Sequence, residues 1–128
     1  MAARLSVTRG LSYPHTRRTP VRRQVRRVRF AALVAPESVL LGQVRTLAAL
    51  YGWLPYHTHD SRKSEPGFPD LCLVRGDRLI FAELKTQRGR LTAAQTAWLD
   101  KLRATHAEVY VWRPSDLPVV AAILRRRS

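Results

Sequence analysis

The sequence predicts one α/β domain in which a mixed four-stranded sheet is flanked by helices. Hydrophobic residues make up 45% of the 128 residues, so the chain can bury a modest core. Apolar residues recur at three- and four-residue steps in some segments and form short strand-like runs in others. A helical segment separates the third strand from the fourth, and such a crossover joins parallel strands. These observations together predict the element order αβββαβα.

Three segments have the features of amphipathic helices. The first covers residues 36–51, and Gly52 follows it as a C-terminal stop. Thr92 is the N-cap of a second helix, which ends near residue 105. A third helix begins at Ser115, and its last turn is basic, as the helix dipole favours.

Four short segments have the composition of strands: residues 53–58, 71–74, 78–85 and 108–112. Pro55 places the first strand at an edge of the sheet or at its own start. The second and third strands are separated by Arg75-Gly76-Asp77, which predicts a hairpin with a short turn.

Two carboxylates and a lysine gather at the open end of this hairpin. Asp70 begins the second strand, and Glu83 and Lys85 leave the same face of the third strand because they are two residues apart. Carboxylate oxygens, to which the backbone carbonyl of Leu84 could add another, are the ligands that a hard divalent cation prefers. An adjacent ammonium can orient the attacking water. The cluster therefore predicts a nuclease site that uses Mg²⁺ or Mn²⁺.

The charge of the chain indicates a polyanionic partner. The formal net charge is +14 and the pI is near 11.5, which favours DNA over an anionic membrane surface. No apolar run approaches the ~20 residues that span a bilayer. The lone cysteine fits a reducing compartment, so we expect a cytoplasmic protein of a bacterium or a phage-infected cell.

The first part of the chain differs from the rest. Residues 1–36 contain nine arginines and no acid, which predicts a disordered basic arm over residues 1–35 ahead of a nuclease domain over residues 36–128. Two alternatives stay open for the arm. It also resembles an organelle transit peptide, and the working protein could instead begin near residue 36.

Several motifs carry a resemblance to a known family. They are Gly67-Phe68-Pro69-Asp70-Leu71, Phe81-Ala82-Glu83-Leu84-Lys85, Gly89-Arg90-Leu91-Thr92, and then Gln95, Trp98 and Leu99. In this order they resemble the VRR-NUC (virus-type replication-repair nuclease) family of the PD-(D/E)XK superfamily, over about residues 36–117. The resemblance implies a restriction-endonuclease-like fold. It also implies DNA cleavage in replication or repair, since small phage and bacterial members resemble Holliday-junction resolvases and some act as homodimers on branched DNA.

The resemblance also implies roles for particular residues. Asp70 and Glu83 match the metal-binding acids, Lys85 matches the catalytic lysine, and Gln95 matches a glutamine that supports the site. The family places a further acid on the first helix. Glu37 is the candidate there, and Gln43 is the alternative as a polar substitute.

Other polar residues near the cluster are candidates for DNA contact. The basic residues in the flanking loops are expected to bind phosphates: Arg62, Lys63, Arg88 and Arg90. His57, His59 and Asp60 suggest zinc, but a zinc site usually needs three or four protein ligands, so we favour DNA contact or a structural role for them.

Two further expectations concern the whole chain. A homodimer is expected, with an interface at the sheet edge or on the last helix through Val119, Val120, Ile123 and Leu124. The alternative to an enzyme is a non-catalytic DNA-binding module that keeps the nuclease fold.

Overall fold

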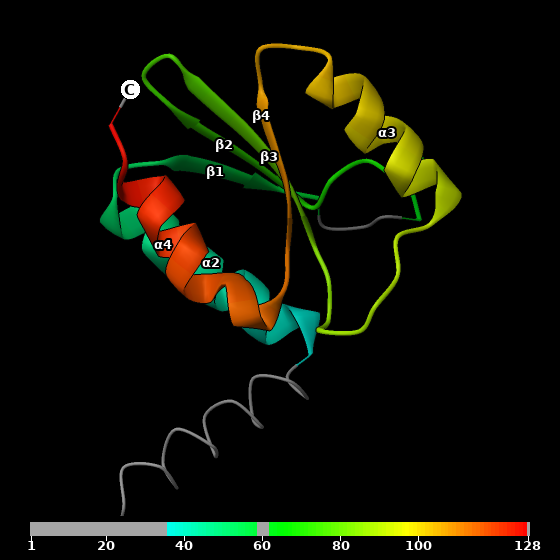
Figure 1. Ribbon diagram of the computed structural model, residues 1–128, viewed down its shortest axis with the longest axis horizontal. Helices are drawn as coiled ribbons and strands as arrows, with labels where there is room; N and C mark the ends of the chain where they lie inside the picture. The colour runs from blue at the N-terminus through cyan, green and yellow to red at the C-terminus, as the bar shows by residue number, and fades with distance from the viewer. Residues whose placement is uncertain (1–35, 59–61, 128) are drawn as a thin grey trace, which may run out of the picture.

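The computed structural model describes residues 36–58 and 62–127 (Figure 1). The arm expected over residues 1–35, and also His59 and Asp60, lie outside these described residues. The elements follow in the order α2 (Glu37–Leu50), β1 (Leu54–His57), β2 (Leu71–Arg75), β3 (Arg78–Leu84), α3 (Ala93–Arg103), β4 (Glu108–Trp112), the 3-10 helix η1 (Pro114–Asp116) and α4 (Leu117–Arg125). The expected α/β class and element order are confirmed.

The four strands form one sheet in the order β1-β2-β3-β4. The first three strands pair antiparallel, and β3 pairs with β4 in parallel after the crossover through α3. The β2–β3 hairpin places Leu71 opposite Ala82, so the residues just before β2 lie beside the end of β3. β1 is an edge strand, as Pro55 predicts.

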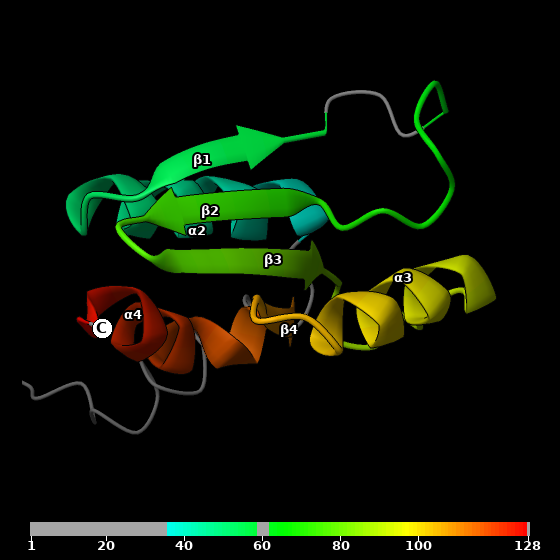
Figure 2. The same cartoon turned by 90° about the horizontal axis from the view of Figure 1, so that it is seen from above.

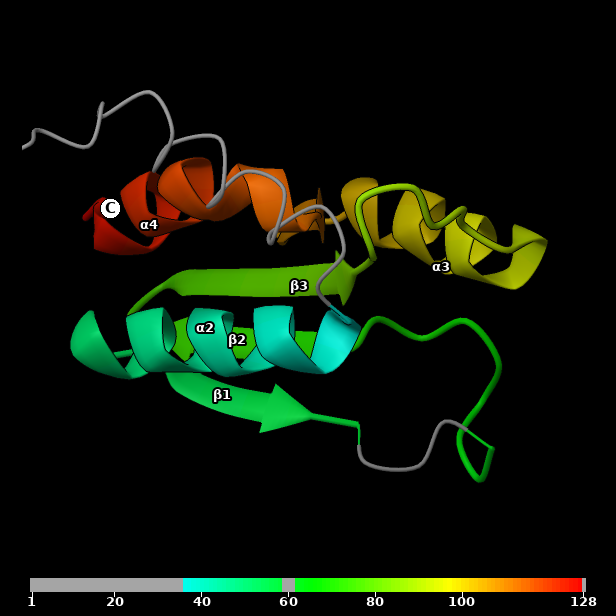
Figure 3. The same ribbon diagram turned by 90° about the horizontal axis from the view of Figure 1, so that it is seen from below.

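Helices α2 and α4 cover one face of the sheet (Figures 2 and 3). Side chains alternate along each strand, so Ile80, Ala82 and Leu84 point from β3 into this core. Leu40 and Val44 from α2 and Val120 and Leu124 from α4 are fully buried against them. Two of the four residues expected to form a dimer interface on the last helix, Val120 and Leu124, are therefore in the core, whereas Val119 is 58% exposed.

The opposite face of the sheet is covered mainly at one end. There, α3 packs beside β4, and Phe68 contacts Phe81 of β3 and Trp98 of α3 in edge-to-face geometry, with ring centroids 5.8 and 5.1 Å apart. Away from α3 this face exposes large apolar side chains: Leu54, Tyr56, Val74 and Leu79.

The C-terminal end of α4 is fixed by side chains from the hairpin. Arg75 donates to the carbonyls of Leu124 and Arg126, and Arg78 donates to Ile123 and also forms a bidentate ion pair with Glu108 at 2.8 Å. Cations at a helix C-terminus offset the partial negative charge of its free carbonyls. These two arginines thus serve the fold, and they lie at the turn end of the hairpin, away from Asp70.

The boundary of the last helix differs from the prediction. Ser115 lies in η1, and α4 begins only at Leu117. Pro114 opens the 3-10 turn and Pro118 lies in the first turn of α4, where its missing N–H costs no hydrogen bond. In the described part of the chain, we find no helix long and apolar enough to span a bilayer.

Candidate active site

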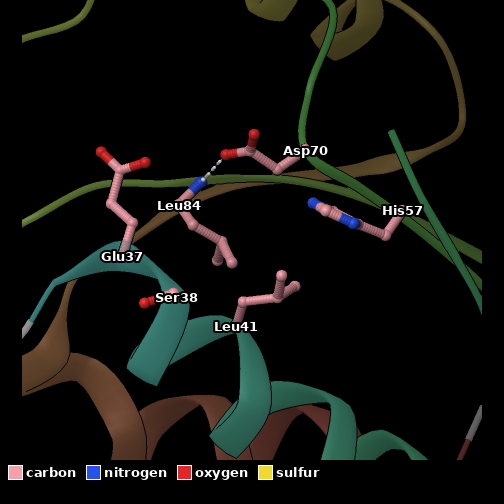
Figure 4. A pocket seen from close by; sticks show the side chains of 6 residues that line it. All are labelled: Glu37, Ser38, Leu41, His57, Asp70 and Leu84. Atoms are coloured by element: carbon pink, nitrogen blue, oxygen red, sulfur yellow. Dashed lines mark hydrogen bonds between the residues drawn. The ribbon is translucent and has the colours of Figure 1, made fainter. Parts of the chain in front are cut away.

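Asp70 lies between the ends of two paired strands. It directly precedes β2, and its Oδ2 accepts a hydrogen bond of 2.8 Å from the backbone N–H of Leu84 at the end of β3 (Figure 4). Its own carbonyl accepts from Thr58 N at 3.2 Å, which continues the β1–β2 pairing by one residue. The carboxylate is therefore held by the backbone of the hairpin, with little freedom to turn away.

Glu83 is nearly buried and has two polar neighbours. It leaves β3 on the face opposite α2 and α4, since Ala82 and Leu84 on either side of it point into the core. Only 3% of the residue is exposed. Its Oε1 accepts from Gln95 Nε2 at 2.9 Å and lies 3.6 Å from Lys85 Nζ.

The environment of Glu83 makes its negative charge costly. Burial raises the pKa of this carboxyl to about 7, and the nearby charge of Asp70 adds to the rise, whereas Lys85 opposes it. Two carboxylates that share a site with one ammonium carry an excess of negative charge. A bound cation would offset it.

Gln95 connects the start of α3 to the carboxylate. Its Oε1 accepts from Thr92 N at 2.9 Å, and its backbone N–H donates to Thr92 Oγ1 at 3.1 Å, which together form a capping box. The same side chain uses its Nε2 for Glu83. One residue thus both starts the helix and orients the acid.

The loop before Asp70 packs on the same helix. Gly67 has φ +88°, and a Cβ built there would lie 2.4 Å from the backbone carbon of Ala94. Only glycine fits both the dihedral angle and this close approach. Trp98 Nε1 also donates to the carbonyl of Pro66 at 3.0 Å. The Gly-Phe-Pro-Asp stretch is therefore held on α3, and this sets the position of Asp70.

Lys85 is 9% exposed and stands where β3 ends. Its backbone N–H donates to the carbonyl of Trp112 at 3.0 Å, which extends the pairing with β4. The Lys85 side chain runs beside the following loop, where a Cβ built on Gly89 would be in ordinary van der Waals contact with Lys85 Cδ at 3.6 Å. Its ammonium lies 3.6 Å from Glu83 Oε1.

A pocket of about 160 Å³ opens beside Asp70 on the α2 side of the sheet (Figure 4). Glu37 from the start of α2 and His57 from β1 line it, together with Ser38, Leu41, Asp70 and Leu84. Gln43 lines a different pocket, with Leu117 and Ala121 of α4. Of the two first-helix candidates, the structure brings Glu37 and not Gln43 to Asp70.

The residues expected to bind phosphate lie in the loop before Asp70 and in the loop after Lys85. Arg62, Lys63, Arg88 and Arg90 are all at least partly exposed. Sequence reasoning missed Arg113, whose guanidinium donates to carbonyls of the loop that carries Arg88 and Arg90. No local signal could have identified it, because it lies 24 to 27 residues from its partners.

The donor set fits a magnesium-type ion in its chemistry. Within residues 36–58 and 62–127 no group of three or more His, Cys, Asp and Glu side chains is arranged to hold a metal ion. Mg²⁺, however, commonly uses one or two carboxylates and completes its shell with water and substrate phosphates. Asp70 and Glu83 supply such a pair of carboxylates.

The open four-stranded mixed sheet that the described residues form, with its three helices, is a restriction-endonuclease-like α/β fold. The sequence pattern of the VRR-NUC domain matches residues 15–116, most of the chain, so the protein belongs to the VRR-NUC family. Its function is accordingly of the nuclease type, and its substrate is DNA. Searches of curated proteins and of solved structures give no significant match.

Proposed function

We propose that the protein is a metal-dependent endonuclease that hydrolyses phosphodiester bonds in DNA, with Mg²⁺ or Mn²⁺ as cofactor. The observation that carries the proposal is the meeting of Asp70, Glu83 and Lys85 at one end of the hairpin. A surface ion pair would be solvated, whereas Glu83 and Lys85 are 3% and 9% exposed. Burying Glu83 beside a second, half-buried acid is costly, and such an arrangement is typical of a functional site.

Each residue has a role in this proposal. The carboxylates of Asp70 and Glu83 and the backbone carbonyl of Leu84 are the candidate ligands. Glu37 is a further candidate, because it lines the pocket beside Asp70. When bound, the ion polarises the scissile phosphate and lowers the pKa of a coordinated water. Lys85 orients the attacking water and offsets charge that builds on the phosphate. Gln95 holds Glu83 in place through its Nε2.

DNA is expected to lie across the open end of the hairpin. Arg62 and Lys63 lie in the loop before Asp70, Arg88 and Arg90 lie in the loop after Lys85, and all four residues are exposed. Arginine suits phosphate because its fork donates two parallel hydrogen bonds. These contacts supply affinity but no base specificity.

We further propose that the preferred substrate is branched DNA and that the protein acts on it as a homodimer. Symmetric cutting of a four-way junction needs two active sites related by a two-fold axis. The edge strand β1, with Leu54 72% and Tyr56 63% exposed, is the better candidate for the interface, since α4 is packed into the core.

Incubation of the purified protein with junction, flap and linear DNA, in Mg²⁺ or in EDTA, tests the proposal. The expected result is cleavage in Mg²⁺ and none in EDTA. Cleavage should be fastest on the junction, and light scattering should show that the protein is a dimer. Binding without any cleavage would instead identify a non-catalytic DNA-binding module. Equal cutting of all substrates by a monomer would contradict branch selectivity and leave a general nuclease.

A further inference from the structure

Arg113, the residue after β4, holds the loop that follows Lys85. Its Nη1 donates to the backbone carbonyls of Thr86 at 2.8 Å and Gly89 at 2.6 Å, with Gln87 O at 3.4 Å. The loop over residues 86–90 therefore turns three carbonyl groups inward, onto one half-buried guanidinium.

Further hydrogen bonds fix this loop to the segment after β4. Gln87 Nε2 donates to Ser115 Oγ at 2.9 Å, and Ser115 N donates to Gln87 Oε1 at 3.1 Å. Within the loop, Gly89 N donates to Thr86 O at 3.2 Å. Arg113 is itself anchored, since its backbone N–H donates to Asp116 Oδ2 at 2.8 Å. The loop is thus held rigidly on both sides of its turn.

The inward carbonyls determine the direction of the neighbouring N–H groups. The described chain has no cis peptide bond, and in a trans peptide the C=O and the next N–H point in opposite directions. The N–H groups of Gln87, Arg88 and Arg90 must therefore point away from Arg113. Within the described residues none of the three donates to a protein acceptor.

The outer side of the loop consequently combines two kinds of donor. Its peptide N–H groups point outward, and the side chains of Arg88 and Arg90 reach solvent next to them. On the inner side the negative ends of the peptide dipoles are neutralised by Arg113. Oriented backbone N–H groups and arginines are the donors that proteins use for phosphate.

We infer that Arg113 makes the loop over residues 86–90 a phosphate-binding element, in which the N–H groups of Gln87, Arg88 and Arg90 contact a DNA phosphate next to Lys85. Arg113 is a positioning residue, because it acts through the loop and does not itself contact DNA. This inference rests on the proposed function only for the identity of the ligand as DNA.

The test is the affinity for a short DNA duplex in EDTA, measured for Arg113→Lys. Lysine keeps the charge, but its compact ammonium cannot reproduce the arrangement of the planar guanidinium. We expect the affinity to fall by about tenfold or more. The control Arg125→Met removes an exposed charge from the end of α4. It should lower the DNA affinity less than Arg113→Lys does, although of the two substitutions only Arg125→Met changes the net charge.

Amide NMR of the same samples separates a positioning role from a purely structural one. In the wild type, the amide signals of Gln87, Arg88 and Arg90 should shift as the duplex is added, and in Arg113→Lys they should not. If Arg113→Lys melts earlier but binds DNA as the wild type does, Arg113 only braces the fold and the inference is overturned. Gln87→Ala removes both hydrogen bonds to Ser115 and should also weaken DNA binding. It replaces Arg113→Lys as the test variant if Arg113→Lys does not fold.

The inference and the proposed function fail in distinguishable ways. Binding in EDTA requires no cleavage, so a protein that never cuts DNA can still show the loop contacts. A protein that cuts normally while the loop amides stay unshifted would overturn the inference and leave the nuclease intact.

Discussion

Among single residues, Glu83 has the most unusual environment. It is 3% exposed, it lies beside a second acid, and its charge is opposed mainly by Lys85. Burial and Asp70 together bring its pKa to about 7 from an ordinary value of 4.5. Below a pH of about 7 the metal-free protein therefore keeps a proton on this group, and the proton must leave before the carboxylate can bind a cation.

The raised pKa of Glu83 predicts how the stability of the metal-free protein depends on pH. Below pH 4.5 the group is protonated in both the folded and the unfolded chain. Between 4.5 and about 7 the unfolded carboxyl ionises while the folded one stays neutral, so folding stability is lost as the pH rises. Thermal unfolding in EDTA should show the wild type losing stability relative to Glu83→Gln across this window.

Added Mg²⁺ should reverse this loss, because it binds the deprotonated form. At a pH above about 7, Mg²⁺ should raise the thermal unfolding midpoint of the wild type. Near pH 4.5 the rise should be much smaller. If the unfolding midpoints of the wild type and Glu83→Gln in EDTA differ by the same amount at every pH, the pKa of the Glu83 carboxyl is not raised as described.

At the scale of elements, the site is built by docking α3 onto the end of the hairpin. The loop over residues 66–69 and the capping box of Thr92 and Gln95 meet at the first turn of α3. From there Gln95 reaches Glu83, and the loop leads directly into Asp70. The precise separation of the acids therefore depends on a backbone contact at Gly67.

Replacement of Gly67 tests this dependence. Gly67→Ala introduces a Cβ within 2.4 Å of Ala94 at φ +88°, so we expect a loss of at least about 2 kcal/mol of stability and a marked fall in cleavage. Gly76→Ala is the matched control, since Gly76 has φ +58° but no atom within 4 Å of the new Cβ. It should cost only about 1 kcal/mol and leave cleavage unchanged. Equal effects of the two substitutions on cleavage would contradict the docking argument.

The elements also show what sequence can and cannot predict. The hairpin follows from a short turn between two strand-like runs, the parallel β4 from the helical crossover before it, and the Thr92 cap from a local capping pattern. All three are visible in the order and spacing of residues along the chain. Long-range partners leave no such pattern. Arg75 looks like a turn residue in the sequence and Arg78 like the first residue of a strand, yet both bind the end of α4. Likewise, helical spacing alone could not decide between Glu37 and Gln43, because their directions depend on how α2 lies on the sheet.

At the scale of the whole molecule, the distribution of charge suggests that different parts of the chain serve DNA cleavage and DNA affinity. The acids of the site are outnumbered by cations across a chain of net charge +14, and residues 1–36 hold nine of the arginines. Each phosphate that a protein neutralises releases counterions, so such a chain should bind DNA in a strongly salt-dependent manner. We therefore expect the arm to add affinity, while the hairpin performs the cleavage.

Deletion of residues 1–35 tests this division. The shortened protein should stay folded, bind DNA more weakly and show a shallower dependence of affinity on salt. The logarithmic slope should fall by about 0.9 for each phosphate that the shortened protein no longer neutralises. Circular dichroism and binding at several salt concentrations provide the measurement. A deletion that unfolds the protein would show that the segment belongs to the domain, and the family match begins within it, at residue 15.

The most direct measurement of the central claim is the cleavage rate of Asp70→Ala, Glu83→Ala and Lys85→Ala in saturating Mg²⁺, with DNA binding measured on the same samples. We predict that each substitution abolishes cleavage, since it removes a metal ligand or the group that orients water. Binding should stay close to that of the wild type, because the arginines supply most of the affinity. A Glu83→Ala protein that cuts DNA at the wild-type rate would contradict the assignment of the site.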